Sequence, residues 1–190
     1  LADDHPEQIR RRLRHFAARP AMDIEGLGEA AVELLVSQLG VTSPADLYDP
    51  ERVNPERVAA LEGYAELSAH NLCKAIDESR GRELWRLVHG LGIPQVGATT
   101  AKDLTRRFPS LEALAQATTE ALQQVDGIGE IVAESVVTWF ADPRHRELVA
   151  TLTARGLNVD ESAAREAAGP RHLEGKVFVL TGTLAGLTRD

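Results

Sequence analysis

The 190-residue sequence predicts an all-α chain in which pairs of short helices are repeated in tandem. Two observations support this fold class. A glycine-containing turn followed by an amphipathic helix recurs at residues 24–39, 61–76, 91–108 and 125–140. No β-strand pattern precedes residue 157, and only 4% of the residues are aromatic, so the core must be largely aliphatic, as in small helical packs.

The fourth copy, VDGIGEIVAESVVTWF, shows the repeated pattern most fully. Gly127 and Gly129 flank one apolar residue, which lets the backbone adopt positive φ and lets another molecule approach closely. The following helix carries an apolar stripe of Val132, Val136, Trp139 and Phe140. Free amides at the positive end of such a helix suit a phosphate oxygen.

The other three copies keep parts of this pattern. The first has Gly26 and Gly28, the second has Gly63, and the third has Gly97, with Gln95 in the place of the first glycine. The equivalent positions Gly28, Ala65, Gly97 and Gly129 are separated by 32 to 37 residues, enough for two short helices and two loops. One isolated pair of glycines is usually an ordinary connection, but four tandem copies are hard to explain in that way.

The remaining helices are predicted in chain order from capping residues and apolar spacing. Residues 8–18 place Ile9, Leu13 and Phe16 on one face. Leu84, Leu87, Val88 and Leu91 form a stripe that leads into the third copy, and Gly156 ends the last helix. The predicted N-caps are Ser43 and Asn54 (each before a proline), Ser110, Thr118 or Thr119, and Asp142 before Pro143.

The composition limits the function classes. The net charge of −8 argues against DNA binding at first sight, because DNA-binding domains are usually basic. However, cations cluster in the first twenty residues and on the helix after the third turn, and a binder that uses backbone amides needs fewer of them. These cations are Arg10, Arg11, Arg12, Arg14, Arg19, Lys102, Arg106 and Arg107. A single cysteine excludes an internal disulfide and favours a reducing compartment, and we see neither a membrane span nor a signal peptide.

The C-terminal residues change in character. Residues 157–172 have little apolar content and no periodicity, which indicates a linker, and KVFVLT at residues 176–181 indicates a β-strand. A single strand cannot be stable alone, so we expect it to begin another domain. The expected domains are residues 1–8 as the tail of an upstream module, 9–156 as a helical DNA-binding domain, 157–172 as a linker and 173–190 as that next domain's start.

Nearly the whole chain resembles the C-terminal half of bacterial NAD-dependent DNA ligases. HFAARPAMDIEGLGE, LEGYAELSAHNLCKAI, LGIPQVGATTAKDL and VDGIGEIVAES resemble that family's four helix-hairpin-helix units. LEGKVFVLTGTL resembles the opening of its α/β BRCT domain, with Thr181 and Gly182 in a phosphate-capable turn. The resemblance implies a parent enzyme that seals nicks in double-stranded DNA, with NAD as adenylate donor and a divalent metal such as Mg²⁺, acting as a cytoplasmic, nucleoid-associated monomer.

The expected DNA contacts are backbone amides at the glycine turns, which would grip phosphates without reading sequence. The predicted contact residues are Gly26, Gly28, Gly63, Gly97, Gly127 and Gly129, with Lys102 and Arg106 as secondary candidates.

Two departures from the family pattern affect this prediction. The last cysteine of the family's zinc finger would fall at His5, before Pro6, and histidine can bind zinc. No other ligand is visible and Cys73 lies on an apolar stripe, so we expect no zinc in this chain and keep His5 only as a weak candidate ligand in a longer parent chain. None of Lys74, Lys102 and Lys176 stands in the Lys-x-Asp-Gly motif of the family's nucleophile, so we expect no catalytic residue and no activity from this chain alone. The alternatives are a stand-alone helix-hairpin-helix DNA-binding or nuclease-targeting module, and a protein-interaction scaffold of helical repeats.

Overall fold

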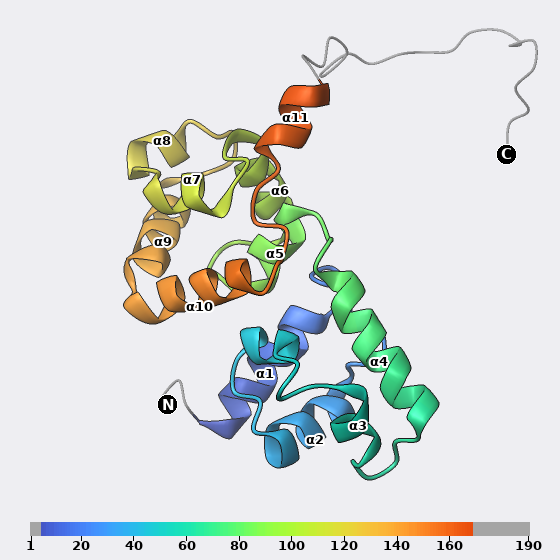
Figure 1. Ribbon diagram of the computed structural model, residues 1–190. Helices are drawn as coiled ribbons and strands as arrows, with labels where there is room; N and C mark the ends of the chain where they lie inside the picture. Colours follow the sequence, from blue (N-terminus) through green and yellow to red (C-terminus); the bar gives the residue numbers. More distant parts are fainter. Residues whose placement is uncertain (1–4, 169–190) are drawn as a thin grey trace, which may run out of the picture.

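The computed structural model describes residues 5–168, and within that range the chain is helical, with no strand and one isolated β-bridge between Ser110 and Asp160 (Figure 1). The elements are α1 (Pro6–Ala17), α2 (Glu29–Leu39), the 3₁₀ helix η1 (Pro44–Tyr48), α3 (Pro55–Ala59), α4 (Glu66–Ser79), α5 (Leu84–Gly90), α6 (Ala98–Arg107), α7 (Leu111–Gln116), α8 (Thr119–Gln123), α9 (Glu130–Ala141), α10 (Pro143–Ala154) and α11 (Ser162–Ala168). The all-α prediction is confirmed for this range. The predicted strand at residues 176–181, Thr181 and Gly182 lie outside the described residues.

Most of the predicted N-caps start helices as expected. The side chains of Asn54, Ser110, Thr118 and Asp142 each accept a hydrogen bond from an amide two or three residues ahead, over 2.9 to 3.2 Å. Ser43 behaves differently, because its amide donates to the Asp46 carboxylate over 3.0 Å. That carboxylate also accepts from the Thr42 amide over 2.8 Å, so Asp46 completes a capping box with Ser43, the predicted N-cap of η1.

The helices form two lobes (Figure 1). Helices α1 to α4, with η1, form the first lobe, and α5 to α10 form the second. Within the lobes, α1 contacts α2, α3 contacts α4, α5 contacts α6, and α8 contacts α9. The amphipathic spacing explains this pairing, because each helix buries its apolar stripe against its neighbour.

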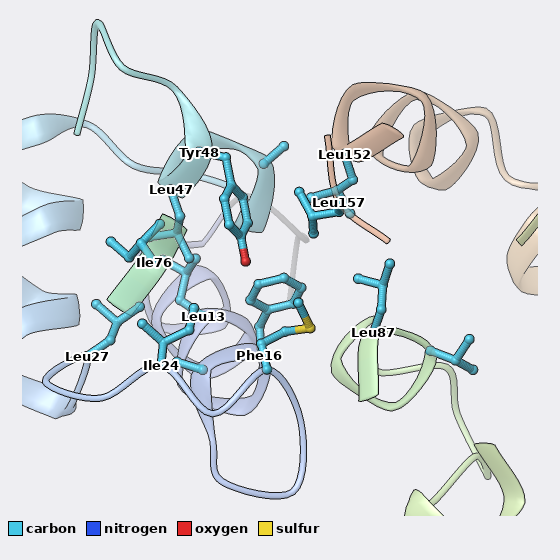
Figure 2. Close-up of a cluster of buried hydrophobic side chains, with 14 of the residues drawn as sticks. Leu13, Phe16, Ile24, Leu27, Leu47, Tyr48, Ile76, Leu87, Leu152 and Leu157 are labelled. Atoms are coloured by element: carbon cyan, nitrogen blue, oxygen red, sulfur yellow. The ribbon is translucent and has the colours of Figure 1, made fainter. Parts of the chain in front are cut away.

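One continuous apolar core connects the lobes. Leu13 and Phe16 of α1 are fully buried. Figure 2 shows Phe16 and Tyr48 of the first lobe beside Leu87, Leu152 and Leu157 of the second. The two lobes therefore share buried surface, which restricts their relative movement.

Tyr48 carries a polar group into this core. Its hydroxyl lies 2.7 Å from the Ser79 Oγ, and Ser79 itself donates to the Ile76 carbonyl over 2.6 Å. The Ser79 proton is thereby used, so Tyr48 is the donor in the pair. Burial raises the pKa of Tyr48 to about 12.

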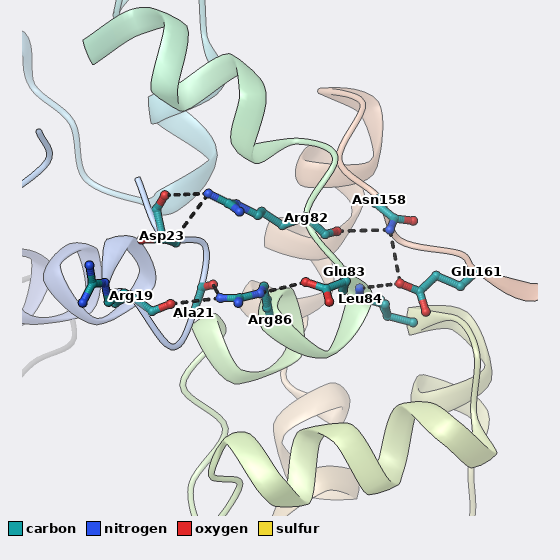
Figure 3. Close-up of polar contacts among 9 residues, drawn as sticks. All are labelled: Arg19, Ala21, Asp23, Arg82, Glu83, Leu84, Arg86, Asn158 and Glu161. Carbon is teal, nitrogen blue, oxygen red and sulfur yellow. Dashed lines mark hydrogen bonds and ion pairs between the residues drawn. The ribbon is translucent and has the colours of Figure 1, made fainter. Parts of the chain in front are cut away.

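A polar joint links the lobes where the chain passes from α4 to α5 (Figure 3). Arg82 donates to the carbonyl and carboxylate of Asp23 over 3.2 Å each. Arg86 donates to the carbonyls of Arg19 and Ala21 over 2.9 and 3.1 Å. Both arginines thus fasten the start of the second lobe to the loop that follows α1.

The segment after α10 makes further hydrogen bonds to the same polar joint. The Asn158 side chain donates to the Arg82 carbonyl over 3.1 Å, and the Asn158 amide donates to the Arg80 carbonyl over 2.8 Å. The Leu84 amide, at the start of α5, donates to the Glu161 carboxylate over 2.7 Å. Asn158, Glu161 and α11 fall in the range 157–172, which the sequence pattern predicts to be a linker. Neither the hydrogen bonds of these two residues to the α4–α5 connection nor the helix α11 follows from that pattern.

Replacing Tyr48 by phenylalanine is expected to lower the free energy of unfolding by about 1 kcal/mol at neutral pH, because one buried hydrogen bond is lost. The raised pKa adds a pH dependence: the unfolded phenol ionises near pH 10.0 and the folded one near pH 12, so the wild-type chain loses stability as the pH rises through that window. Tyr48→Phe should lack this loss. Urea denaturation at several pH values measures both effects. Tyr64→Phe, at a half-buried phenol whose hydroxyl has no hydrogen bond in the described chain, is the control for the loss at neutral pH only, because burial also raises the pKa of Tyr64; equal curves for Tyr48→Phe and wild type would contradict the prediction.

Replacing Glu161 by alanine is expected to lower the free energy of unfolding by about 1–3 kcal/mol, because the buried Leu84 amide loses its acceptor. Urea denaturation followed by circular dichroism measures the change. Glu166→Ala provides a matched control, since Glu166 is exposed on α11 and has no partner in the described chain. The joint would be energetically unimportant if both variants unfolded at the same urea concentration.

Candidate nucleic-acid interface

Four turns in the structure share one backbone conformation. Each has a residue with positive φ at the position that the sequence pattern assigns to the first glycine. These residues are Gly26 (84°), Gly63 (80°), Gln95 (66°) and Gly127 (81°). We name the turns corners 1 to 4, comprising residues 24–31, 61–68, 93–100 and 125–132. Gln95 adopts the left-handed conformation although it is not a glycine, which supports its alignment with the glycines of the other corners.

A largely apolar side chain, buried in three corners and half-buried in the other, anchors the middle of each corner. Leu27, Val96 and Ile128 are 5 to 7% exposed, and Tyr64 is half-buried. Each of these four amides also donates to the carbonyl three residues back, over 3.0 to 3.2 Å. The turn is therefore fixed from the inside, and the residues on both sides of the anchor face outward.

The next position in each corner is the N-cap of the following helix. Gly28, Ala65, Gly97 and Gly129 all have extended backbone, with φ between −120° and −82°. This conformation is open to any residue, as Ala65 shows. A Cβ added at Gly28, Gly97 or Gly129 would meet no atom within 4 Å. Neither strain nor internal packing therefore requires glycine at these three positions.

The amides that follow these caps have no partner in the described chain. The carbonyl of each cap residue accepts from the amide four residues on, over 2.8 to 3.0 Å. The three amides in between, such as those of Glu130, Ile131 and Val132 in corner 4, make no hydrogen bond within residues 5–168. In corner 2 the Ala65 amide is used, because it donates to the Ser68 Oγ over 2.9 Å. Each corner thus presents unpaired donors at the positive end of a helix.

The six predicted glycines are all exposed, and they divide into two kinds. Gly26, Gly63 and Gly127 hold the left-handed position and shape the turn. Glycines of the second kind have no side chain that would cover the backbone amides of the corner. They are Gly28, Gly97 and Gly129. Lys102 and Arg106 lie on α6 after corner 3, where the Lys102 ammonium sits 4.3 Å from the Trp85 ring and Arg106 pairs with Asp103 over 2.9 Å.

Charge is distributed unequally among the corners. Acidic residues flank corners 1, 2 and 4: Glu25, Glu29, Glu62, Glu66, Asp126 and Glu130. Corner 3 has proline and alanine at the equivalent positions, and Lys102 follows it one turn later. Glu29 is bound by Arg14 over 2.7 Å, which reduces its charge at corner 1. Corner 3 is therefore the most favourable of the four for an anion.

The arginines near the N-terminus are engaged mainly within the protein. Arg10 pairs with Glu33 and Arg14 pairs with Glu7 and Glu29, so these side chains tie α1 to α2. Arg11 and Arg12 line a cleft of about 850 Å³. Arg144 of α10 and Pro94 of corner 3 also line it. No acidic side chain of the described residues lines this cleft. Arg144 pairs with the Asp142 carboxylate over 2.7 Å, so the charge that it brings to the cleft is largely neutralised.

No group of three or more histidine, cysteine, aspartate or glutamate side chains that could hold a metal ion occurs among residues 5–168. His5 caps α1, and its ring accepts from the Glu7 amide over 3.3 Å. Cys73 is half-buried, and burial raises the pKa of its thiol. Within the same residues, no helix has the length and apolar character needed to cross a bilayer.

Comparisons with known proteins agree with this geometry. Residues 19–78 match the model of a SAM-like helix-hairpin-helix tandem, and residues 86–149 match the model of a helix-hairpin-helix motif. The chain is 47% identical over 185 residues to a DNA ligase of Synechococcus sp. (strain JA-3-3Ab), covering 97% of this chain and 27% of that protein. A DNA ligase of Heliobacterium modesticaldum is 47% identical and one of Marinobacter nauticus is 43% identical, each over 97% of this chain and 27% of the relative. The chain thus spans about a quarter of the length of these relatives.

Proposed function

We propose that this chain, a segment of the bacterial DNA ligase type with helix-hairpin-helix motifs, binds duplex DNA for an enzyme that seals nicks. In this proposal the four corners are four helix-hairpin-helix units. The corner amides donate hydrogen bonds to phosphate oxygens on both sides of the nick, across the minor groove. Because phosphates carry no sequence information, the binding is independent of sequence.

The unpaired amides at the four exposed corners carry this proposal. Unpaired backbone donors at a helix start favour an anionic ligand, and phosphate is the group that such positions commonly bind. Glycine at positions 28, 97 and 129 has no role in packing or strain, so its value is that it lets another backbone approach. The repeat of the same geometry at intervals along the chain fits a periodic polyanion better than a single small ligand.

The net charge of −8 is compatible with this function because binding is local. Several acidic side chains are paired with arginines of α1, and no acidic side chain of the described residues lines the cleft beside corner 3. At low salt, the long-range electrostatic interaction between the whole chain and DNA is weakly attractive or repulsive. Binding therefore depends on the corners rather than on electrostatic steering by the net charge.

The parent enzyme is proposed to use NAD as adenylate donor and Mg²⁺, at sites outside this chain, which contains no Lys-x-Asp-Gly motif. We assign no zinc role to His5, which caps α1. Thr181 and Gly182 remain proposed phosphate contacts of a BRCT domain. The parent is proposed to act as a monomer in the bacterial cytoplasm at the nucleoid. Similarity to ligases over 97% of the chain favours this function over a nuclease-targeting module or a protein scaffold.

Replacing Gly129 by valine should weaken binding to a nicked duplex by roughly fivefold, which corresponds to the loss of about one hydrogen bond. The extended backbone at Gly129 accepts valine, so helicity and melting temperature should not change. Fluorescence anisotropy with a labelled duplex measures the affinity, and circular dichroism measures the fold.

Gly81→Val is a suitable control for this variant. Gly81 lies between α4 and α5, away from the corners, and a Cβ there meets only the Glu78 carbonyl at 3.9 Å. Gly129→Ala should have an intermediate effect, since Ala65 occupies the equivalent position in corner 2. Wild-type affinity in Gly129→Val would remove corner 4 from the interface.

The affinity of the wild-type chain for duplex DNA should fall steeply with salt. If the corners and nearby cations neutralise about 4–8 phosphates, the logarithm of the binding constant should fall against the logarithm of the KCl concentration with a slope of about −4 to −7. Anisotropy titrations between low and physiological salt give this slope. Duplexes of unrelated sequence should give equal slopes. A slope near zero would instead indicate that no phosphate contact drives the interaction.

A further inference from the structure

Two large apolar side chains are exposed within residues 5–168, Leu67 at 72% and Ile131 at 73%. Each is the second residue of the helix that starts within a corner, Leu67 on α4 in corner 2 and Ile131 on α9 in corner 4. The equivalent residues after corners 1 and 3 are the small Ala30 and Thr99. The second corner of each lobe therefore carries an exposed apolar side chain that the first corner lacks.

The position of these side chains relates them to the unpaired amides. In an α-helix the bond from Cα to Cβ tilts toward the N-terminus, so a side chain in the first turn points past the start of the helix. The amides of the same first turn point in that direction too. Leu67 and Ile131 therefore extend toward the surface that would meet a phosphate bound at their own corners.

We infer that Leu67 and Ile131 pack against the deoxyribose edges of the duplex minor groove, beside the phosphates held at corners 2 and 4. This inference rests on the proposed function. Each phosphate is joined to two sugars, whose C–H groups form the nearest apolar surface of the polymer. Contact with them would bury side chains that the folded chain leaves in water, and it would add a contribution to affinity that does not depend on charge.

The charges at corners 2 and 4 also favour an apolar contact there in addition to phosphate binding. Glu62 and Glu66 flank corner 2, Asp126 and Glu130 flank corner 4, and none of them has an ion-pair partner in the described chain. In corner 2 the cap amide is already used by Ser68. Corners 2 and 4 are thus less favourable for phosphate than corner 3, and an apolar contact with the adjoining sugar compensates for this weakness.

The test is the double variant Leu67→Ala/Ile131→Ala of the full 190-residue chain, titrated with a labelled nicked duplex at several KCl concentrations. We expect affinity to fall by about 3- to 10-fold at every salt concentration, with an unchanged salt slope, because apolar burial is lost and no phosphate contact is. Leu67→Met/Ile131→Leu, which keeps the apolar surface, should retain wild-type affinity.

Asn71→Ala/Thr138→Ala is the matched control, since both residues are exposed and lie on the same two helices. Its affinity should equal that of the wild type, and circular dichroism should show all variants folded. Unchanged affinity in Leu67→Ala/Ile131→Ala, or a changed salt slope, would overturn the inference while leaving phosphate binding at the corners intact. A dimer in sedimentation that the double variant abolishes would overturn it in favour of a second copy of the chain. If the wild type itself shows no salt-dependent binding, the proposed function fails instead.

Discussion

The structure depends on how each corner pairs the hydrogen-bonding groups of its backbone. One buried side chain and one hydrogen bond across the turn hold the left-handed residue and the extended cap in place. The amide of the anchoring residue is thereby paired, whereas the amides that follow the cap have no partner within residues 5–168. A corner built in this way is rigid before any ligand arrives, so binding would not require ordering of a loop, and the entropy cost of that ordering is avoided.

The second constraint is the joint between the lobes. A shared apolar core and a set of hydrogen bonds around Arg82, Arg86 and Glu161 connect elements that are far apart in sequence. The acceptors are mainly carbonyls that would otherwise be unpaired near the core, so separation of the lobes would expose them together with apolar surface. This cost keeps corners 1 and 2 in a defined relation to corners 3 and 4.

Local sequence patterns were sufficient to predict the helices up to α10, most of their caps and all four corners, whereas α11 was not predicted. This success has a physical basis, because a cap such as Asn54 or a left-handed glycine such as Gly127 acts within a few residues of its own position. Even Gln95 was placed correctly by spacing alone. At Ser43 the N-cap position was predicted correctly, but the contribution of Asp46 was not, because its carboxylate reaches back to the amides that precede the helix.

The features that the sequence did not reveal depend on distant partners. Asn158 and Glu161 lie in a polar stretch that resembles a linker, and their roles become visible only when the α4–α5 connection is brought beside them. The arginines of α1 suggested a basic surface, but Arg10 and Arg14 meet glutamates of α2 after folding. The exposure of Leu67 and Ile131 was likewise hidden, because an apolar residue in an amphipathic helix is ordinarily expected to be buried.

The stiffness of the joint has a consequence for the nucleic acid under the proposed function. A protein whose two lobes cannot rotate freely holds its contact points at fixed positions. Where these positions do not fit straight B-form DNA, the DNA duplex itself must bend or unwind to reach them. An interrupted strand is easier to deform than an intact one, because stacking is weaker at the break. Such a fixed arrangement of contact points would therefore discriminate between damaged and continuous DNA by flexibility, without recognising the break chemically.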